Sequence, residues 1–540
     1  MNRWRQIAAV LWLLPALAAA KSPGGAAAGE ALYLDGVLQS GGTLEASRDS
    51  GGTTSGRAAA CVNCHRHSGL GMTEGSVPIP PIAGSYLFQP RIPDRTQAAL
   101  TYVSNARANR DPYTDALLAR VIRQGLDSEG RPLNVLMPHY RIGDADMANL
   151  IAYLKTLDPQ PAPGVSDTLL HFATIVTPEA DAAARRGMLD VLSHYFADKN
   201  AFPFPPTPKM RSSGKTLYAK SMYMANRHWQ LHVWELSGPP ATWEPQLQRH
   251  LAAEPVLAVV SGLGGAHWAP VHQFCERQRL PCLFPNVEVP IVDERDFYPV
   301  YFSKGVLLEA GLIANHLSGG AGEVTQVYRL HDSGEAAALA LRAALDGGGF
   351  KIQSKALPTE ATATQIREAV SGAPRGVLVL WLRAEDLAAL EGVAPPASSQ
   401  VFISGIMGGL EHSPLPKQWR ARVEMTYPQD LPASSQVRVG VPLQWFKIKG
   451  IPLVAESVQL NTYLACGFLA ETVSHLSDTI GRDYLVERLE EMMEHRLMTG
   501  PYPRLTLAAG QRFASKGGYL VRFADSEGER LLADGDWTVP

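Results

Sequence analysis

Two cysteines and a histidine stand close together in a chain that has only 5 cysteines among its 540 residues. They occur in the stretch RAAACVNCHRHSGLGM, where Cys61, Cys64 and His65 form the pattern C-x-x-C-H. One turn of helix presents both thiols and the imidazole to the same side of the backbone. The fold around this stretch must therefore let two thiols and an imidazole converge on one group, which constrains the chain more than any other feature of its sequence.

The first residues have the three regions of a secretory signal. Arg3 and Arg5 precede an apolar run over residues 7–17, and three alanines at 18–20 follow it. The run is shorter than the about 20 residues that are needed to span a bilayer. We therefore expect residues 1–20 to be a cleaved signal peptide, the mature chain to have no stable membrane span, and its location to be the periplasm.

Export is compatible with covalent attachment of one haem c at the C-x-x-C-H motif. Both thiols would form thioether bonds with the porphyrin, and His65 would bind the iron as the proximal ligand. A methionine thioether is a common sixth ligand in electron carriers. Met137 lies in a loop bounded by proline and glycine, ahead of an amphipathic helix, in GRPLNVLMPHYRIGDADMANLIAYLKTL. The sequence thus predicts His65 and Met137 as the iron ligands.

Other interpretations of the motif compete with haem attachment. Cys61 and Cys64 could form a strained disulfide, or they could bind zinc together with two further ligands. Candidates for the sixth position of a haem iron, besides Met137, are Met72, His67 and His139. The two histidines are also the nearest additional zinc ligands.

Residues 29–158 resemble a class I cytochrome c domain. The motifs GEALYLDGVL, CVNCH, PPIAG, MPHY and LIAYLKTL occur in the order typical of that family. The resemblance implies an all-α domain in which a proline of PPIAG, best matched by Pro81, packs against and orients His65. The Gly- and Ser-rich segment QSGGTLEASRDSGGTTSG departs from the family pattern, and we expect it to be a flexible surface insertion.

The chain changes character after this domain. Residues 159–167 are proline-rich and predict a semi-rigid linker. Over residues 168–540, β-rich runs such as LLHFATIV and GVLVLWL alternate with helical stretches such as VLLEAGLIANHL. This alternation predicts βαβ units with parallel sheets, and the length of the segment favours two α/β lobes.

Residues 168–540 resemble the type I periplasmic solute-binding proteins, in the branched-chain amino-acid-binding group. The resemblance rests on LAVVSGLGGAHWAPVHQFCERQRLPCLFPNV and VFISGIMGGLE, and it implies two lobes that close on a small ligand. Such binders hold the α-carboxylate with Ser and Thr hydroxyls of the first lobe, and the α-amino group with an acidic residue of the second. The matching positions here are Gly264, Gly265, Ala266, His267 and Trp268 in the first lobe, and Ile406 in the second.

Because both polar anchors are missing, we expect an unknown small molecule other than an α-amino acid. Trp268 and the nearby Tyr301 would suit a less polar or aromatic ligand. The alternatives are that Trp268 and His267 only pack the interface of the lobes, and that the cleft is a docking surface. Cys275 and Cys282, in FCERQRLPC, predict either a local disulfide or two buried thiols.

Two modules on one chain predict an exported electron carrier fused to a small-molecule-binding module. Its redox partner would be a periplasmic dehydrogenase or another cytochrome. The alternative is an ABC-type uptake or sensory ligand-binding protein in which the haem is accessory. A net charge of −3 with no basic tract argues against nucleic acid. The sequence predicts that the protein is a carrier and not an enzyme. A haem enzyme would require an exchangeable ligand at the sixth coordination position of the iron.

Overall fold

The computed structural model describes eleven segments of the chain, and the predicted signal peptide at 1–20 lies outside them. Contacts divide the chain into two compact units, 1–159 and 160–540. The described residues are 25–48, 51–88, 110–157, 162–201, 227–293, 295–373, 376–396, 400–476, 480–494, 500–525 and 530–540.

The first unit is built on the crossing of two helices, α1 (Ala26–Asp35) and α6 (Asp144–Thr156). Gly29 permits a close crossing, because a Cβ atom there would lie 2.0 Å from the carbonyl oxygen of Asn149. Buried leucine, isoleucine and tyrosine side chains fill the space around the crossing, and their removal from water stabilises the unit. The other helices described in this unit are α2 (Val62–His65), α3 (Gly84–Leu87) and α5 (Asp115–Gln124).

The first unit also contains strands, which corrects the prediction of an all-α domain. The Gly- and Ser-rich segment, expected to be flexible, forms β1 (Glu45–Ser47) and β2 (Thr53–Ser55), and β1 pairs with β5 (His139–Arg141). The middle side chain of β1 is buried, so the segment contributes to the core instead of standing away from it. A second antiparallel pair consists of β3 (Met72–Glu74) and β4 (Val77–Ile79).

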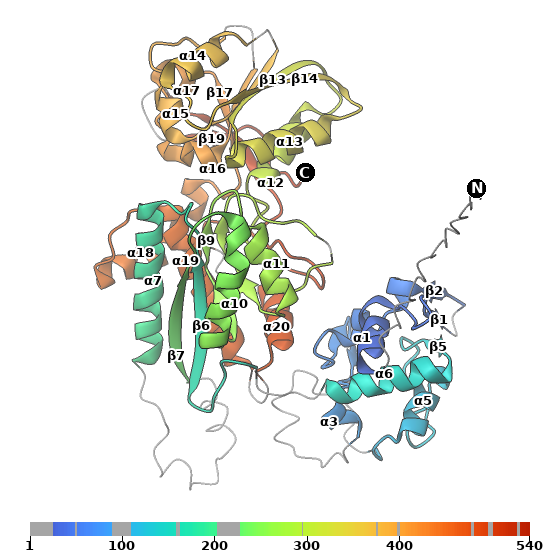
Figure 1. Cartoon of the computed structure of the whole chain (residues 1–540). Helices are drawn as coiled ribbons and strands as arrows, with labels where there is room; N and C mark the ends of the chain where they lie inside the picture. The colour runs from blue at the N-terminus through green and yellow to red at the C-terminus, as the bar shows by residue number, and fades with distance from the viewer. Residues whose placement is uncertain are drawn as a thin grey trace, which may run out of the picture. The chain divides into compact units, whose positions relative to one another are not determined.

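The second unit contains a parallel sheet of seven strands, ordered β11-β9-β6-β8-β10-β12, with β7 paired to β6. Helices α7, α19 and α20 cover one face of this sheet, and α10 and α11 cover the other (Figure 1). Strands buried on both faces explain the nearly continuous apolar runs in the sequence. The bounds are β6 (Leu169–Val176), β7 (His228–Glu235), β8 (Ala258–Val260), β9 (Leu263–Gly264), β10 (Cys282–Leu283), β11 (Asn286–Val287), β12 (Pro299–Val300), α7 (Ala182–Asn200), α10 (Trp243–Ala253), α11 (Ala269–Arg277), α19 (Glu456–Ser474) and α20 (Arg482–Glu494).

A second sheet of seven strands has the order β14-β13-β15-β16-β17-β18-β19. The first five strands are parallel, and β18 and β19 are antiparallel to their neighbours. The predicted parallel α/β architecture is thereby confirmed, with antiparallel strands added at one edge. The bounds are β13 (Ala321–Arg329), β14 (Gly349–Leu357), β15 (Val377–Trp381), β16 (Gln400–Ile403), β17 (Val423–Tyr427), β18 (Tyr519–Phe523), β19 (Leu531–Ala533), α12 (Val306–Leu317), α13 (Ser333–Leu345), α14 (Ala363–Ser371), α15 (Ala384–Ala388), α16 (Gly405–Gly408), α17 (Lys417–Arg420) and α18 (Pro432–Lys449).

The predicted linker covers residues 159–167, but residues 162–167 are packed as part of the second unit, and residues 159–161 lie outside the described residues. Ala162 is buried, and its N–H group donates a hydrogen bond of 3.0 Å to the carbonyl oxygen of Ile480. Gly164 passes so close to the second unit that a Cβ atom would lie 2.6 Å from the Cα atom of Val256. Residues 162–167 therefore belong to the second unit, since their backbone is packed and hydrogen-bonded there.

Candidate functional site

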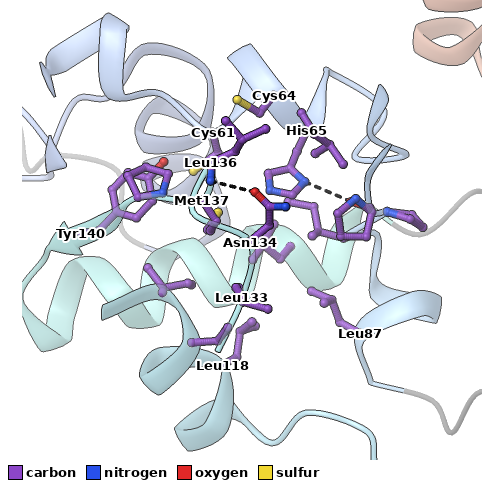
Figure 2. A pocket seen from close by; sticks show the side chains of 18 of the residues that line it. Cys61, Cys64, His65, Leu87, Leu118, Leu133, Asn134, Leu136, Met137 and Tyr140 are labelled. Carbon is purple, nitrogen blue, oxygen red and sulfur yellow. Dashed lines mark hydrogen bonds between the residues drawn. The ribbon is translucent and has the colours of Figure 1, made fainter. Parts of the chain in front are cut away.

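The C-x-x-C-H motif forms one short helical turn beside a cavity. Cys61 immediately precedes α2, and the N–H group of His65 donates to the carbonyl oxygen of Cys61 over 2.9 Å. Both cysteines and His65 line a cavity of about 360 Å³. Figure 2 shows the His65 ring in this cavity, with Cys61 and Cys64 along one of its edges. The turn thus brings the two thiols and the imidazole to a common space.

His65 is buried, and one hydrogen bond determines the role of each ring nitrogen. Nδ1 lies 3.1 Å from the carbonyl oxygen of Pro80, which can only accept, so Nδ1 carries the proton and Nε2 keeps a lone pair for a metal. Burial lowers the pKa of His65 to about 4, and the bond to Pro80 opposes this only in part. The imidazole is therefore neutral at physiological pH, as a metal ligand must be.

Pro80, and not the predicted Pro81, supplies the carbonyl group that orients His65. Pro81 lines the cavity one residue further along. The loop returns this close because Gly71, with φ 77°, approaches it: a Cβ atom there would lie 2.1 Å from the carbonyl oxygen of Ile79. Adjacent prolines left this choice open in the sequence, and the path of the loop decides it.

Met137 faces the same cavity from the opposite part of the first unit. Its N–H group donates to the carbonyl oxygen of Asn134 over 3.0 Å, and the N–H group of Leu136 donates to Asn134 Oδ1, also over 3.0 Å (Figure 2). These two bonds close a tight turn that presents the half-buried thioether to the cavity. The structure therefore brings together His65 and Met137, the two iron ligands predicted from the sequence.

The competing interpretations of the motif gain no support from the geometry. Met72 lies in β3, His67 in the loop after α2, and His139 in β5, and none of the three lines the cavity. Cys61 and Cys64 are separate thiols. Within the described residues, no group of three or more Cys, His, Asp or Glu side chains is placed to hold a metal ion. A zinc site at the motif would therefore lack its further ligands in that part of the chain.

The remaining lining of the cavity is mostly apolar and suits a flat, largely apolar macrocycle. It comes from α1, α3, α5 and α6, from β4 and the loop after it, and from the loop before β5. The residues present fit a covalently attached haem, with two thiols for the links, one neutral imidazole and one thioether. Sequence reasoning did not single out several lining residues, which become visible only when the helices are assembled: Leu32, Leu44, Tyr113, Leu118, Asn134 and Tyr140.

The aromatic residues predicted to contact a ligand in the second unit lie in its core. Trp268 is fully buried, and a Cβ atom at either Gly262 or Gly264 would lie 2.7 Å from a carbon atom of its indole ring. Tyr301 is also buried, and its hydroxyl group lies 2.7 Å from Nδ1 of His272. The glycines are thus required by packing of the indole, and the predicted ligand-binding role of Trp268 is corrected to a structural one.

A carboxylate of the chain itself occupies the predicted anchor of the first lobe. The N–H group of His267 donates to Oε2 of Glu179 over 3.3 Å, and Nδ1 of His267 contacts Oε1 of the same side chain. A Cβ atom at Gly265 would lie 2.9 Å from Glu179 Oε2. Ala266 lies half-buried between these residues. The turn that was predicted to approach a ligand therefore holds Glu179, which follows β6 far earlier in the chain.

The predicted anchor of the second lobe is also occupied from within. The N–H group of Ile406 donates to Glu309 Oε1 over 2.9 Å, and the Thr426 hydroxyl group donates to the same oxygen over 2.8 Å. Ser404 contacts the other oxygen. Glu309 is fully buried on α12, and this desolvation raises its pKa to about 7, against the opposing effect of its hydrogen bonds. The one sequence signal for it was a single acidic residue inside the apolar helix VLLEAGLIANHL.

Glu309 should make the second unit less stable as pH rises. Its pKa is about 7 in the folded chain and 4.5 without burial, so the folded state binds more protons between these values. The free energy of unfolding should fall by about 3 kcal/mol from pH 4.5 to 7 and then level off. Glu309→Gln should remove this slope, because the amide does not titrate and its oxygen can still accept from Ile406 and Thr426.

Urea unfolding followed by tryptophan fluorescence measures this effect on the second unit alone, since all tryptophans after the predicted signal peptide lie there. Glu360→Gln, at an exposed position, is the matched control and should keep the slope. An unchanged slope in Glu309→Gln would show that Glu309 does not titrate in this range.

A helical domain whose C-x-x-C-H turn, neutral imidazole and thioether share one apolar cavity defines a c-type cytochrome domain. The cytochrome c family model matches residues 52–158, and this part of the chain is a cytochrome c domain. A search of curated protein sequences finds no match for the chain. None of the helices among the described residues is long and apolar enough to cross a bilayer.

Solved structures show that the second unit has the fold of the solute-binding proteins. A substrate-binding protein of an ABC transporter from Aeropyrum pernix is 13% identical, with a TM-score of 0.52, and the match covers 69% of this chain and 96% of that one. A solute-binding protein from Rhodopseudomonas palustris BisB5, in complex with 3,4-dihydroxybenzoic acid, is 12% identical, with a TM-score of 0.52 and coverages of 69% and 99%.

A third solved structure comes from Rhodopirellula baltica and is described as a possible leucine/isoleucine/valine-binding protein. It is 17% identical, with a TM-score of 0.47 and coverages of 70% and 98%. The family match at residues 52–158 and the two structures with a TM-score of 0.52 confirm the predicted fusion of a cytochrome c domain with a solute-binding fold.

Proposed function

We propose that this protein is an exported one-haem electron carrier fused to a module that binds a small molecule. The observation that carries the proposal is that His65, oriented by Pro80, shares a cavity with Met137 and with the two thiols of the motif. The haem, when bound, supplies one-electron transfer between the ferric and ferrous states. The protein would act as a carrier and not as an enzyme, and its redox partner would be a periplasmic dehydrogenase or another cytochrome.

Each part of the first unit has a distinct task in this proposal. Cys61 and Cys64 would hold the group covalently, and His65 would bind its iron. Met137 would supply a thioether ligand, which favours the reduced state and raises the reduction potential. The apolar lining excludes water from the cavity, which also affects the potential.

The second unit would close two lobes on a ligand that is not an α-amino acid. Glu179 and Glu309 supply carboxylates at the two positions where the resemblance places the polar anchors for an α-amino acid. A ligand carboxylate near Glu179 would be repelled by it. The two sheets of the unit would belong to the two lobes, which supports this proposal.

Redox titration with and without candidate ligands tests the proposal. The ligands would first be found by screening for small molecules that raise the melting temperature of the second unit. Reversible one-electron titration of export-matured protein supports a carrier. A protein that binds a ligand and a permease, while its haem fails to exchange electrons with any periplasmic oxidoreductase, would support the alternative of an uptake or sensory protein.

We expect Cys275 and Cys282 to become a disulfide after export. Both are buried, on α11 and β10, and the hydrogen bond between the thiols, together with burial, raises the pKa of Cys275 well above its ordinary value. Oxidation by a thiol oxidant of the compartment would remove two protons and two electrons, and closure of this short loop would stabilise the unit by about 2.5 kcal/mol. Intact mass of alkylated protein with and without reductant decides it: two alkylated thiols before reduction would contradict the disulfide.

A further inference from the structure

We infer that the inserted hairpin formed by β1 and β2 is a clamp that positions the loop of Met137 and limits exchange of the sixth ligand. This inference rests on the proposed haem site and goes beyond it. The hairpin is the Gly- and Ser-rich segment that departs from the family pattern. Its juxtaposition with β5, which begins two residues after Met137, carries the argument.

One strand of the hairpin, β1, pairs with β5, the strand that follows Met137. β1 is the central strand of the three, with β2 on one side and β5 on the other. The register places Ala46 opposite Tyr140 and Ser47 opposite His139. In the described part of the chain, β1 is the strand that pairs with β5. The strand conformation of β5, directly after Met137, is therefore stabilised by pairing with β1, about ninety residues earlier in the chain.

Buried side chains attach the same hairpin to the cavity. Leu44 is 1% exposed and Ala46 is 3% exposed, and Leu44 lines the cavity itself. Tyr140, the partner of Ala46, is buried and also lines the cavity. Displacement of β1 would thus expose apolar surface and loosen a wall of the cavity beside Met137 at the same time.

Backbone bonds at the ends of β1 tie the hairpin to the rest of the unit. The N–H group of Leu44 donates to the carbonyl oxygen of Gly36 over 2.8 Å. The carbonyl oxygen of Leu44 accepts from the N–H group of Gly56, also over 2.8 Å. Gly36 and Gly56 touch so closely that a Cβ atom at Gly36 would lie 2.1 Å from the carbonyl oxygen of Gly56. The clamp is therefore anchored at its base, directly after α1 and directly before the C-x-x-C-H turn.

The loop of Met137 is held by few bonds of its own. Its turn is closed by the two bonds to Asn134, and the exposed Val135 beside it contributes little burial. The guanidinium group of Arg123 donates to the carbonyl oxygen of Ile142, directly after β5. A segment with little burial opens at low free energy, and the ladder of β5 adds to that energy here. The rate at which an external ligand replaces the thioether should therefore depend on β1.

The experiment measures imidazole binding to the ferric full-length protein in Ala46→Pro and in Ala46→Gly. The alternation of the ladder directs the N–H group of Ala46 toward β2, so proline disturbs the central strand from that side, whereas glycine keeps the donor but loosens the strand. The matched control is Thr73→Pro, the middle residue of β3, a strand of the same length that pairs with β4 in a sheet separate from the ladder of β5. The readouts are the stopped-flow rate and the charge-transfer band of methionine-ligated ferric haem.

We expect Ala46→Pro to bind imidazole about tenfold faster than the unchanged protein, which corresponds to about 1.4 kcal/mol. Ala46→Gly should show a smaller increase, and Thr73→Pro should show none. Equal rates in all proteins with an intact methionine band would overturn the clamp and leave the proposed function standing. Unchanged protein without covalent haem would instead overturn the proposed function. If Ala46→Pro fails to fold, the Ala46→Gly rate decides alone.

Discussion

Export-matured protein in which both Cys61 and Cys64 are replaced by alanine is expected to contain no covalent haem. The thiols are the two points of attachment, and they lie with His65 along one edge of the cavity. A non-covalent haem would depend on the axial ligands alone and would be extracted by acidified solvent. Denaturing gels stained for haem should lose their signal, and the mass should equal that of the processed polypeptide.

The matched control for this variant replaces the other close pair, Cys275 and Cys282, by alanine. These thiols lie in the second unit, so the haem stain and the visible spectrum should be unchanged. Covalent haem that persists after loss of Cys61 and Cys64 would contradict the attachment site. A colourless unchanged protein would contradict the cytochrome assignment as a whole.

Met137→Ala is expected to abolish the methionine-ligated signature and to lower the reduction potential by on the order of 0.1 V, within the roughly 0.8 V that axial ligands span. The thioether favours ferrous iron, and an alanine leaves the sixth position to water or to another side chain. Potentiometric titration followed in the visible region measures both effects in one experiment.

Met72→Ala provides the control for Met137→Ala, because Met72 lies in β3 and does not line the cavity. Its spectrum and potential should match those of the unchanged protein. A Met137→Ala protein with an unaltered ferric spectrum would exclude Met137 as the sixth ligand. If the Met72 variant lost the signature instead, the cavity assignment of the two methionines would be wrong.

Local patterns predicted much of the fold because their causes are local. The run LLHFATIV is β6 from Leu169 to Val176, and VLLEAGLIANHL is α12 from Val306 to Leu317. Periodicity of apolar residues reports burial on one or both faces of an element, and both faces are covered here. The order of these elements was sufficient to indicate parallel α/β sheets.

Contacts between distant segments escaped prediction. Glu179 reaches the turn at His267, and Glu309 reaches Ile406, each from roughly ninety residues away. The sequence does not distinguish a glutamate that binds groups inside its own chain from a glutamate that is exposed to solvent. The aromatic side chain of Trp268 was likewise indistinguishable from a ligand contact until two glycines were seen to pack against it.

The sequence by itself determined the order of the modules and the groups on which covalent haem attachment is predicted. The C-x-x-C-H spacing is local, so one helical turn keeps the two thiols and the imidazole together, and the alternation of strands and helices follows from the residues within each element. The tertiary structure alone decided which proline carbonyl orients His65, that a Gly- and Ser-rich insertion folds against the strand after Met137, and that carboxylates fill the predicted ligand anchors. These outcomes depend on the free energy of contacts between segments far apart in the chain. Local sequence patterns carry no information about such contacts.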